Sequence, residues 1–272
     1  MTQVPIDGGR LIFVAGLHRS GTTPLARALA AHPDVSGLTD TNVEEDEGQH
    51  VQDVYPVAKT HGGPGRFALR AAAHLTESSP LVSADNAATL VTAWSKYWDV
   101  SRPFLLEKSP PNLIMGRFLQ ALFPGSALVV VIRHPVIVTL STKKWAPRTS
   151  LHRLMENWVE AHRLFRADLP QLERVTLVRY EDLVAQPADE LARVGRALGL
   201  DGDVPADLIQ SSRSSSYEKR WDDMAHGSVL ERRRRGAIER DFAAVAGQYG
   251  YDLTDLHRLG PRPELAGLAA GA

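Results

Sequence analysis

Short apolar runs alternate with amphipathic stretches along most of the chain. Four of these runs are rich in leucine or β-branched residues, and they cover residues 11–15, 104–106, 127–132 and 175–178. Short runs that are apolar throughout are typical of parallel strands buried on both faces of a sheet. We therefore predict four parallel strands, each followed by a turn.

A helical pattern follows each predicted strand, over residues 22–31, 112–123, 136–144 and 189–198. Two further helices are predicted over 84–99 and 152–167. In the last of these, Leu154, Trp158, Ala161 and Phe165 recur at spacings of three and four residues, which gives one apolar face directed to the core. Strands that alternate with helices predict a three-layer α/β fold around a central, mostly parallel sheet.

The domain organisation is predicted from the segments that break this alternation. Residues 34–102 form a long insert between the first two predicted strands, and it contains the Gly/Pro-rich stretch HGGPGRF. Residues 201–229 are polar and serine-rich, which predicts a loop or a mobile cover over a site. We expect one domain over 1–272, with an acceptor-side insert at 34–102 and a cover segment at 201–250.

Composition excludes several classes of function. The 272 residues include no cysteine, which excludes disulfides, thiolate nucleophiles and cysteine-bound metals. Thirty-one basic and thirty-two acidic residues give a net charge of −1, which argues against a broad nucleic-acid surface. The beginning of the sequence lacks the pattern of a secretory signal, and no apolar run reaches the length of a membrane span. We expect a cytoplasmic protein without a membrane span, whose oligomeric state the sequence leaves open.

The stretch GLHRSGTTPLARAL, residues 16–29, has the glycine spacing of a phosphate-binding loop. A strand, a glycine turn and a helix N-terminus direct free backbone N–H groups and the positive end of the helix dipole to one point. The Walker A pattern requires a lysine where this chain has Thr22, and here the cation is Arg19 inside the loop. Arg133 follows the predicted strand 127–132, where a metal-supporting acid would be expected. An anion bound without metal fits this pattern, and a simple turn into a helix is the alternative.

Three motifs in order resemble the sulfotransferases that use 3′-phosphoadenosine 5′-phosphosulfate (PAPS). They are HRSGTT, VVVIRHPVIVTLS and VRYEDL, and the resemblance is strongest to the bacterial and tyrosylprotein types. It extends through Leu183 and weakens after that residue. The resemblance implies a P-loop-like fold, PAPS as the sulfuryl donor, 3′,5′-adenosine bisphosphate (PAP) as the product, and no metal.

The resemblance also assigns residues to the parts of PAPS. The 5′-phosphosulfate loop falls on Arg19, Ser20, Gly21, Thr22 and Thr23. The 3′-phosphate contacts fall on Arg133 and, eight residues later, on Ser141. Tyr180 of VRYEDL matches the position beside the adenine. The alternatives are that Arg133 pairs with a carboxylate and that Tyr180 is a core aromatic residue.

A basic segment near the C-terminus closes over the 3′-phosphate in the family. In this chain the resemblance assigns that role to Arg220 or to one of the arginines at 232–235, in the stretch ERRRRGAIERDF. The small-phenol signature RKGxxG is absent, so the contact stays open. A solvated helix face is the other interpretation of this run.

Catalytic candidates come from two further stretches. Lys108 in LLEKSPPN matches a K-x-P lysine that contacts the bridging oxygen of the sulfate in tyrosylprotein-type relatives, and with Arg19 it would stabilise the charge of the transition state. A surface lysine is the alternative. In NVEEDEGQHVQDVYP the resemblance favours Glu47 as the general base, with Gly48 allowing close approach of the backbone to a ligand.

Other bases remain open. Glu45, His50 and His61 are the alternatives to Glu47, and a solvated acidic loop is the plainest interpretation of the whole segment. The acidic residues match no calcium-loop spacing, so we predict no metal site.

The predicted function is transfer of a sulfuryl group from PAPS to a hydroxyl of a small-molecule, glycolipid or carbohydrate acceptor. Protein tyrosine is a less favoured acceptor. A metal-dependent P-loop kinase or NTPase and a non-catalytic nucleotide- or sulfoglycan-binding module are the rival hypotheses. The resemblance assigns Arg19 and Arg133 to two phosphates of one bound nucleotide, so it requires these residues to lie on the same side of the molecule.

Overall fold

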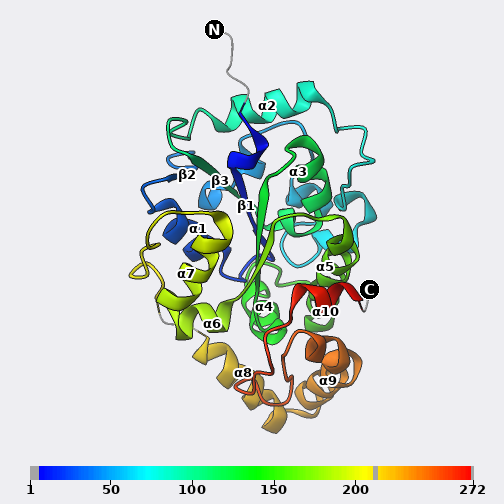
Figure 1. The fold of residues 1–272 in the computed structure, drawn as a ribbon. Helices are drawn as coiled ribbons and strands as arrows, with labels where there is room; N and C mark the ends of the chain where they lie inside the picture. The colour runs from blue at the N-terminus through cyan, green and yellow to red at the C-terminus, as the bar shows by residue number, and fades with distance from the viewer. Residues whose placement is uncertain (1–5, 211–213, 271–272) are drawn as a thin grey trace.

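The strands of the central sheet are all parallel, as the alternating pattern predicts. The structure is a computed structural model that describes residues 6–210 and 214–270 (Figure 1). The strands are β1 Leu11–Gly16, β2 Val35–Gly37, β3 Phe104–Lys108, β4 Ala127–Ile132 and β5 Val175–Arg179. Their order in the sheet is β2-β3-β1-β4-β5. The predicted α/β fold with a parallel sheet is confirmed.

Helices cover both faces of this sheet and its C-terminal end (Figure 1). The α-helices are α1 Thr22–Ala30, α2 Ala84–Trp94, α3 Gly116–Leu122, α4 Pro135–Thr142, α5 Leu151–Asp168, α6 Tyr180–Ala185, α7 Pro187–Leu198, α8 Ser215–His226, α9 Val229–Gln248 and α10 Leu265–Ala270. Within the described parts of the chain, none of the helices has the combination of length and apolar character that a membrane span needs.

Two apolar cores lie on opposite faces of the sheet because successive strand residues point to opposite sides. On one face, Ile12 and Val14 of β1 pack with residues of α1 and α7. On the other, Leu11 and Phe13 pack with residues of α2, α3 and α5. The two-sided burial explains why the strands read as continuous apolar runs rather than as an alternating pattern.

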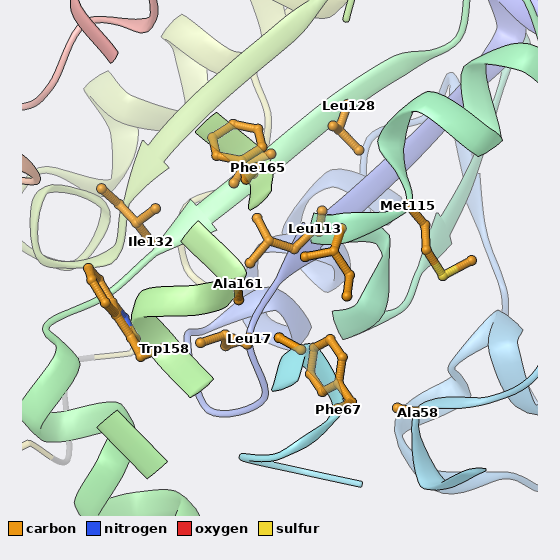
Figure 2. Packing of buried hydrophobic residues seen from close by; sticks show 14 of the residues in the cluster. Leu17, Ala58, Phe67, Leu113, Met115, Leu128, Ile132, Trp158, Ala161 and Phe165 are labelled. Atoms are coloured by element: carbon orange, nitrogen blue, oxygen red, sulfur yellow. The ribbon is translucent and has the colours of Figure 1, made fainter. Parts of the chain in front are cut away.

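Helix α5 packs its apolar stripe against the second face (Figure 2). Trp158 and Phe165 are fully buried there, which confirms them as core residues. Trp158 also donates from Nε1 to the carbonyl of Arg133 at 3.2 Å, so the same ring supports the backbone that follows β4. The core therefore fixes the position of a residue that the sequence assigns to the site.

The structure differs from the sequence predictions in four segments. The helix predicted over 84–99 is shorter, because α2 ends at Trp94. The insert 34–102 contributes an edge strand, β2, which is only three residues long and has a single strongly apolar residue. The helix predicted over 112–123 is divided at Met115 into a 3₁₀ turn, Pro110–Ile114, and α3. The segment 201–229, predicted as a loop, contains helix α8.

Helix α8 forms because its apolar side chains find partners far away in the sequence. Trp221 and Met224 are buried, and Trp221 Nε1 donates to the carbonyl of Leu253 at 2.8 Å. A polar helix with a few buried anchors is stabilised by tertiary packing rather than by its own periodicity. The predicted cover is therefore in part a packed helix, while residues 211–213 lie outside the described residues.

The strand order brings the ends of three strands together. Strand β1 lies between β3 and β4, with Val14 opposite Lys108 and Gly16 opposite Val131. The chain segments after β1, β3 and β4 therefore leave the sheet at neighbouring points. In open parallel sheets, ligands bind in this region, outside the C-terminal ends of the strands.

Candidate functional site

The turn between β1 and α1 has the backbone that the glycine spacing predicts. Gly16 has a φ of +146° and Gly21 a φ of +100°, in the region that favours glycine. A Cβ atom on Gly21 would lie 2.2 Å from the ring of Tyr180, so only glycine fits below this aromatic residue. Gly21 is also the N-cap of α1 and offers no side-chain acceptor to the first N–H groups of the helix.

The side chain of Ser20 is a second notable feature of the loop. Ser20 Oγ is buried and has no hydrogen-bond partner among the described residues. Buried polar atoms without a partner are rare in folded proteins, and a bound ligand or water is a common reason for them. Together with the uncapped N-terminus of α1, the loop has the chemistry of an anion site.

Arg19 and Arg133 lie side by side, as the interpretation requires. Arg133 Nη1 donates to the carbonyl of Arg19 at 3.0 Å, and Arg19 Nε donates to Ser141 Oγ at 2.8 Å. The guanidinium of Arg133 lies over the ring of Tyr180, 4.1 Å from its centroid. Four residues that the sequence assigns to PAPS from three separate motifs therefore form one continuous cluster.

Sequence reasoning missed two members of this cluster, Ser214 and Tyr217. Arg133 Nη2 donates to Oγ of Ser214, the N-cap residue of α8, at 2.7 Å. Tyr217, one turn into α8, shares hydrogen bonds with Ser141 and with Lys144. Burial by itself raises the pKa of the Tyr217 hydroxyl, but those hydrogen bonds and the nearby positive charges lower it overall. The serine-rich run SSSY is the available signal in the sequence, but polar serine-rich stretches are more typical of loops than of a binding site.

Lys108 and Glu47 form a buried ion pair at the end of β3. Lys108 Nζ donates to Glu47 Oε1 at 3.1 Å, and both side chains are almost fully buried. Gln49 Nε2 donates to the other carboxylate oxygen, Glu47 Oε2, at 2.6 Å. His50 Nε2 is 3.6 Å from the same oxygen. Lys108 is therefore not a surface lysine, and Glu47 is not part of a solvated loop.

The other base candidates lie in different settings. Glu45 is exposed and pairs with Arg27 at 3.5 Å, on the outer side of α1. His61 ends a short 3₁₀ turn, Ala58–His61, and is only partly buried. Only His50 shares the neighbourhood of Glu47 among these alternatives.

Gly48 has a different role from the one expected. The sequence suggested that it lets the backbone approach a ligand, but its space is taken by the carboxyl group of Glu107, 2.5 Å from where a Cβ would lie. Glu107 is fully buried and accepts hydrogen bonds from Ser109 Oγ and Asn112 Nδ2. Burial raises the pKa of Glu107 to about 7, although these two hydrogen bonds oppose the shift.

The arginines near the C-terminus do not join the cluster. Arg220 is exposed and pairs with Glu231 at 3.1 Å. Arg235 lies over the ring of Trp221 and donates to the carbonyl of that residue, and Arg232 donates to Gly227. Arg220 as a cofactor ligand stays a prediction; within the described residues at the start of α8, Ser214 contacts Arg133 and Tyr217 contacts Ser141.

Comparison with known proteins identifies the family. The family model described as "Sulfotransferase family" matches residues 11–204. The chain is 25% identical over 199 residues to protein-tyrosine sulfotransferase 2 of Gallus gallus, covering 70% of this chain and 51% of that protein. It is 26% identical over 206 residues to protein-tyrosine sulfotransferase of Drosophila melanogaster, covering 72% of this chain and 38% of that protein.

A bacterial relative matches to a similar degree. Nodulation protein NoeE of Sinorhizobium fredii is 26% identical over 223 residues, covering 73% of this chain and 51% of that protein. This chain thus spans about half or less of the length of these curated relatives.

Solved structures with a similar fold include the sulfotransferase domain of an olefin synthase from Synechococcus, with 20% identity, a TM-score of 0.49 and coverage of 79% of this chain and 82% of that one. Sulfotransferase STF1 of Mycobacterium tuberculosis has 19% identity, a TM-score of 0.49 and coverage of 80% of this chain and 77% of that one. With the family model matching well over half of its residues, the chain belongs to the sulfotransferase family.

Proposed function

We propose that this protein transfers the sulfuryl group of PAPS to a hydroxyl of a small-molecule, glycolipid or carbohydrate acceptor. The observation that carries the proposal is the buried Lys108–Glu47 pair, one strand away from the glycine loop. Removing two charges from water is costly, and a buried pair contributes little net stability. A lysine and a carboxylate kept at the ligand-binding end of the sheet are better explained by chemistry.

The residues of the anion cluster fit the donor. The glycine loop, with the buried Ser20 hydroxyl and the N-terminus of α1, would hold the 5′-phosphosulfate. Arg133 and Ser141 would hold the 3′-phosphate, with Ser214 and Tyr217 as supporting hydroxyls. Tyr180 presents one ring face to Arg133 and closes over Gly21, which suits a residue that borders the adenine.

PAPS supplies the activated sulfuryl group, and the chain supplies a base and cations. Glu47 would accept the proton of the acceptor hydroxyl while the acceptor oxygen forms its bond to sulfur. The bond from sulfur to the bridging phosphate oxygen breaks, and the electron pair stays on that oxygen. Lys108 and Arg19 would stabilise this new negative charge.

The ion pair links these two roles. While Glu47 is ionised, its charge is balanced by Lys108 at 3.1 Å. When Glu47 takes the proton it becomes neutral, so the charge of Lys108 is released for the departing oxygen. The positive charge therefore becomes available when the negative charge develops.

A ligand panel tests the proposal. The melting temperature is measured with PAP, PAPS, ATP and GTP, each with and without Mg²⁺. We expect PAP and PAPS to stabilise the protein without Mg²⁺ by roughly 5–10 °C at a hundredfold excess over the dissociation constant. Arg19→Ala should remove most of this shift, whereas Arg27→Ala, an exposed arginine on α1, should keep it.

Two outcomes contradict the proposal. Stabilisation by Mg·ATP or Mg·GTP beyond that by PAP would favour a kinase or NTPase. Binding of PAP without any PAP formation from PAPS, across saccharide, phenol and peptide acceptors, would favour a non-catalytic binding module.

A further inference from the structure

The proposed base lies on a loop rather than on a regular element. Glu47 stands between two short 3₁₀ turns, Glu44–Asp46 and Gly48–His50, and has extended backbone angles. A loop holds a side chain less precisely than a helix or a strand does, yet a misplacement of about 1 Å in a site can lower turnover roughly a hundredfold. The carboxylate of Glu47 therefore needs contacts that fix its position.

Within the described residues, two groups donate hydrogen bonds to this carboxylate. Lys108 Nζ donates to Oε1 at 3.1 Å, and the side-chain amide of Gln49 donates from Nε2 to Oε2 at 2.6 Å. The contact with Lys108 depends on charge, so it weakens when Glu47 takes up a proton and the ammonium turns to the departing oxygen. The amide of Gln49 is neutral, and it still donates to Oε2 once the proton is on Oε1.

The orientation of the Gln49 amide is itself fixed. Its Oε1 accepts a hydrogen bond from the backbone N–H of Ala58 at 2.8 Å. Since the amide oxygen only accepts and the amide nitrogen only donates, this contact leaves Nε2 as the group that faces Glu47. The side chain is fully buried, so water does not compete for these bonds. Gln49 therefore donates to the carboxylate and is unable to take the proton in its place.

The backbone of Gln49 is tied to the strand that carries the cation. Gln49 N–H donates to Ser109 Oγ at 3.0 Å, and Ser109 Oγ donates in turn to Glu107 Oε1 at 2.5 Å. Asn112 Nδ2 donates to the other oxygen of Glu107 at 2.6 Å. Glu107 and Lys108 are the last two residues of β3. The end of this strand thus supports the cation directly and the residue that holds the base through Ser109.

We propose that Gln49 is the positioning residue of the general base: it holds Glu47 Oε2 and thereby directs Oε1 toward Lys108 and the reacting groups. This inference rests on the proposed sulfuryl transfer, in which Glu47 takes the proton of the acceptor hydroxyl. Gln49 neither gains nor loses a proton in that reaction. The alternative is a purely structural role, in which Gln49 only ties its own loop to Ala58.

A substitution that keeps the volume tests the positioning role. Gln49→Met removes both side-chain hydrogen bonds, and we expect kcat to fall about 10- to 100-fold, while the Kd for PAP changes less than about threefold. Asn157→Leu is the matched control, because Asn157 is similarly buried and accepts from the backbone N–H of Ala68 at 3.0 Å, as Gln49 does from Ala58. Each variant leaves one buried N–H without its acceptor, so the two melting temperatures should fall alike. Only Gln49→Met should lower kcat.

A double-mutant cycle in kcat shows whether Gln49 acts through Glu47. Gln49→Met is combined with Glu47→Gln, which removes the base itself. If Gln49 only positions the carboxylate, the double variant should be slower than Glu47→Gln by no more than about twofold. Independent roles would multiply, so a further loss of about 10- to 100-fold in the double variant would overturn the inference.

A second substitution separates hydrogen-bond donation from packing. Gln49→Glu replaces only the donating NH₂ group by oxygen. Two carboxyl groups this close share one proton, and the new group carries it because Lys108 stabilises the charge of Glu47. We therefore expect kcat relative to the wild type to be largely kept near pH 6 and to fall at least about tenfold near pH 9, where both groups ionise and repel each other.

The wild type is the control for the other titratable groups at this site. His50 Nε2 lies 3.6 Å from Glu47 Oε2, and the charge of Glu47 also acts on Glu107 and Tyr55. These groups are the same in both proteins, so the ratio of the two kcat values at each pH reports the new carboxyl group. A ratio that is equally low at both pH values indicates lost packing and would overturn the donor role.

The results that overturn the inference differ from those that overturn the proposed function. A wild-type protein that forms no PAP from PAPS refutes sulfuryl transfer, and the role of Gln49 with it. An active wild type whose kcat is changed equally by Gln49→Met and by Asn157→Leu refutes the positioning role alone.

Discussion

The buried pair of Lys108 and Glu47 gives the sharpest prediction, which is a double-mutant cycle with Lys108→Met and Glu47→Gln. Both side chains are almost fully buried, and Glu47 also accepts a hydrogen bond from Gln49. Lys108→Met leaves a buried carboxylate without its cation, so we expect a loss of about 3–5 kcal/mol in the free energy of unfolding. This is a large part of the roughly 5–15 kcal/mol of a typical domain, but most of the protein should stay folded.

Glu47→Gln should cost a similar amount, about 3–5 kcal/mol, because it leaves the ammonium of Lys108 buried without its anion. In the double variant neither charge remains, and the amide oxygen still accepts from Gln49. The double variant should therefore be more stable than the sum of the single losses predicts, by roughly 1–3 kcal/mol. Urea unfolding of the four proteins measures this coupling.

An exposed pair provides the control for stability. Arg163 and Glu160 lie 2.7 Å apart on the surface of α5, and the same cycle at this pair should give a coupling below about 0.5 kcal/mol. A coupling free energy between Lys108 and Glu47 as small as that of the surface pair would refute the buried ion pair.

The same variants test the chemistry. Glu47→Gln and Lys108→Met should each lower kcat by about 10²–10⁴, while the Kd for PAP changes little. The double variant should be no slower than the slower single variant, since the two groups act as a unit. Wild-type turnover in Glu47→Gln would remove Glu47 as the base and direct attention to His50.

Two further predictions concern the loop and its support. Gly21→Ala should destabilise the protein by about 1–3 kcal/mol and lower the affinity for PAP, because a φ of +100° is unfavourable for alanine and its Cβ would lie 2.2 Å from the ring of Tyr180. Gly236 on the open face of α9 is the control, and Gly236→Ala should stabilise the protein by about 0.5–1 kcal/mol. Calorimetric melting temperatures and PAP titration of both variants check this, and equal effects at the two glycines would contradict it. Burial raises the pKa of Glu107 to about 7, so between pH 4.5 and 7 the folded state binds more protons than the unfolded state, and stability falls as the pH rises. Glu107→Gln should remove this loss, which amounts to up to roughly 3 kcal/mol. In urea unfolding, the stability of the variant relative to the wild type should therefore improve from pH 5 to pH 8. If the two proteins have parallel pH profiles, the raised pKa of Glu107 is refuted.

Local patterns in the sequence predicted the strands and the motifs of the site. Apolar runs predicted β1, β3, β4 and β5 because burial on both faces requires apolar residues at every position. The glycine loop was predictable because its backbone needs glycine at Gly16 and Gly21, and that requirement shows directly in the sequence. The spacing of Arg133 and Ser141 placed Arg133 directly after one strand and Ser141 two turns into the helix that follows it.

Other parts of the site have no local signal. Ser214 and Tyr217 reach Arg133 and Ser141 only because α8 packs through Trp221 and Met224 against distant segments. The role of Gly48 could not be predicted, because nothing in the sequence shows that the side chain of Glu107 occupies the space beside it.

The sequence by itself therefore determined the α/β class, the glycine loop before α1 and the identities of the charged candidates. Each of these depends on residues that lie close together in the chain. The relevant features are the apolar periodicity, the glycines that the loop backbone needs, and the spacing of residues within one strand and the helix after it. Only the tertiary structure decided that Lys108 and Glu47 are a buried pair, that Arg19 and Arg133 share one cluster, and that helix α8 completes it. Those outcomes depend on which distant side chains exclude water from one another, and that is a property of packing in three dimensions.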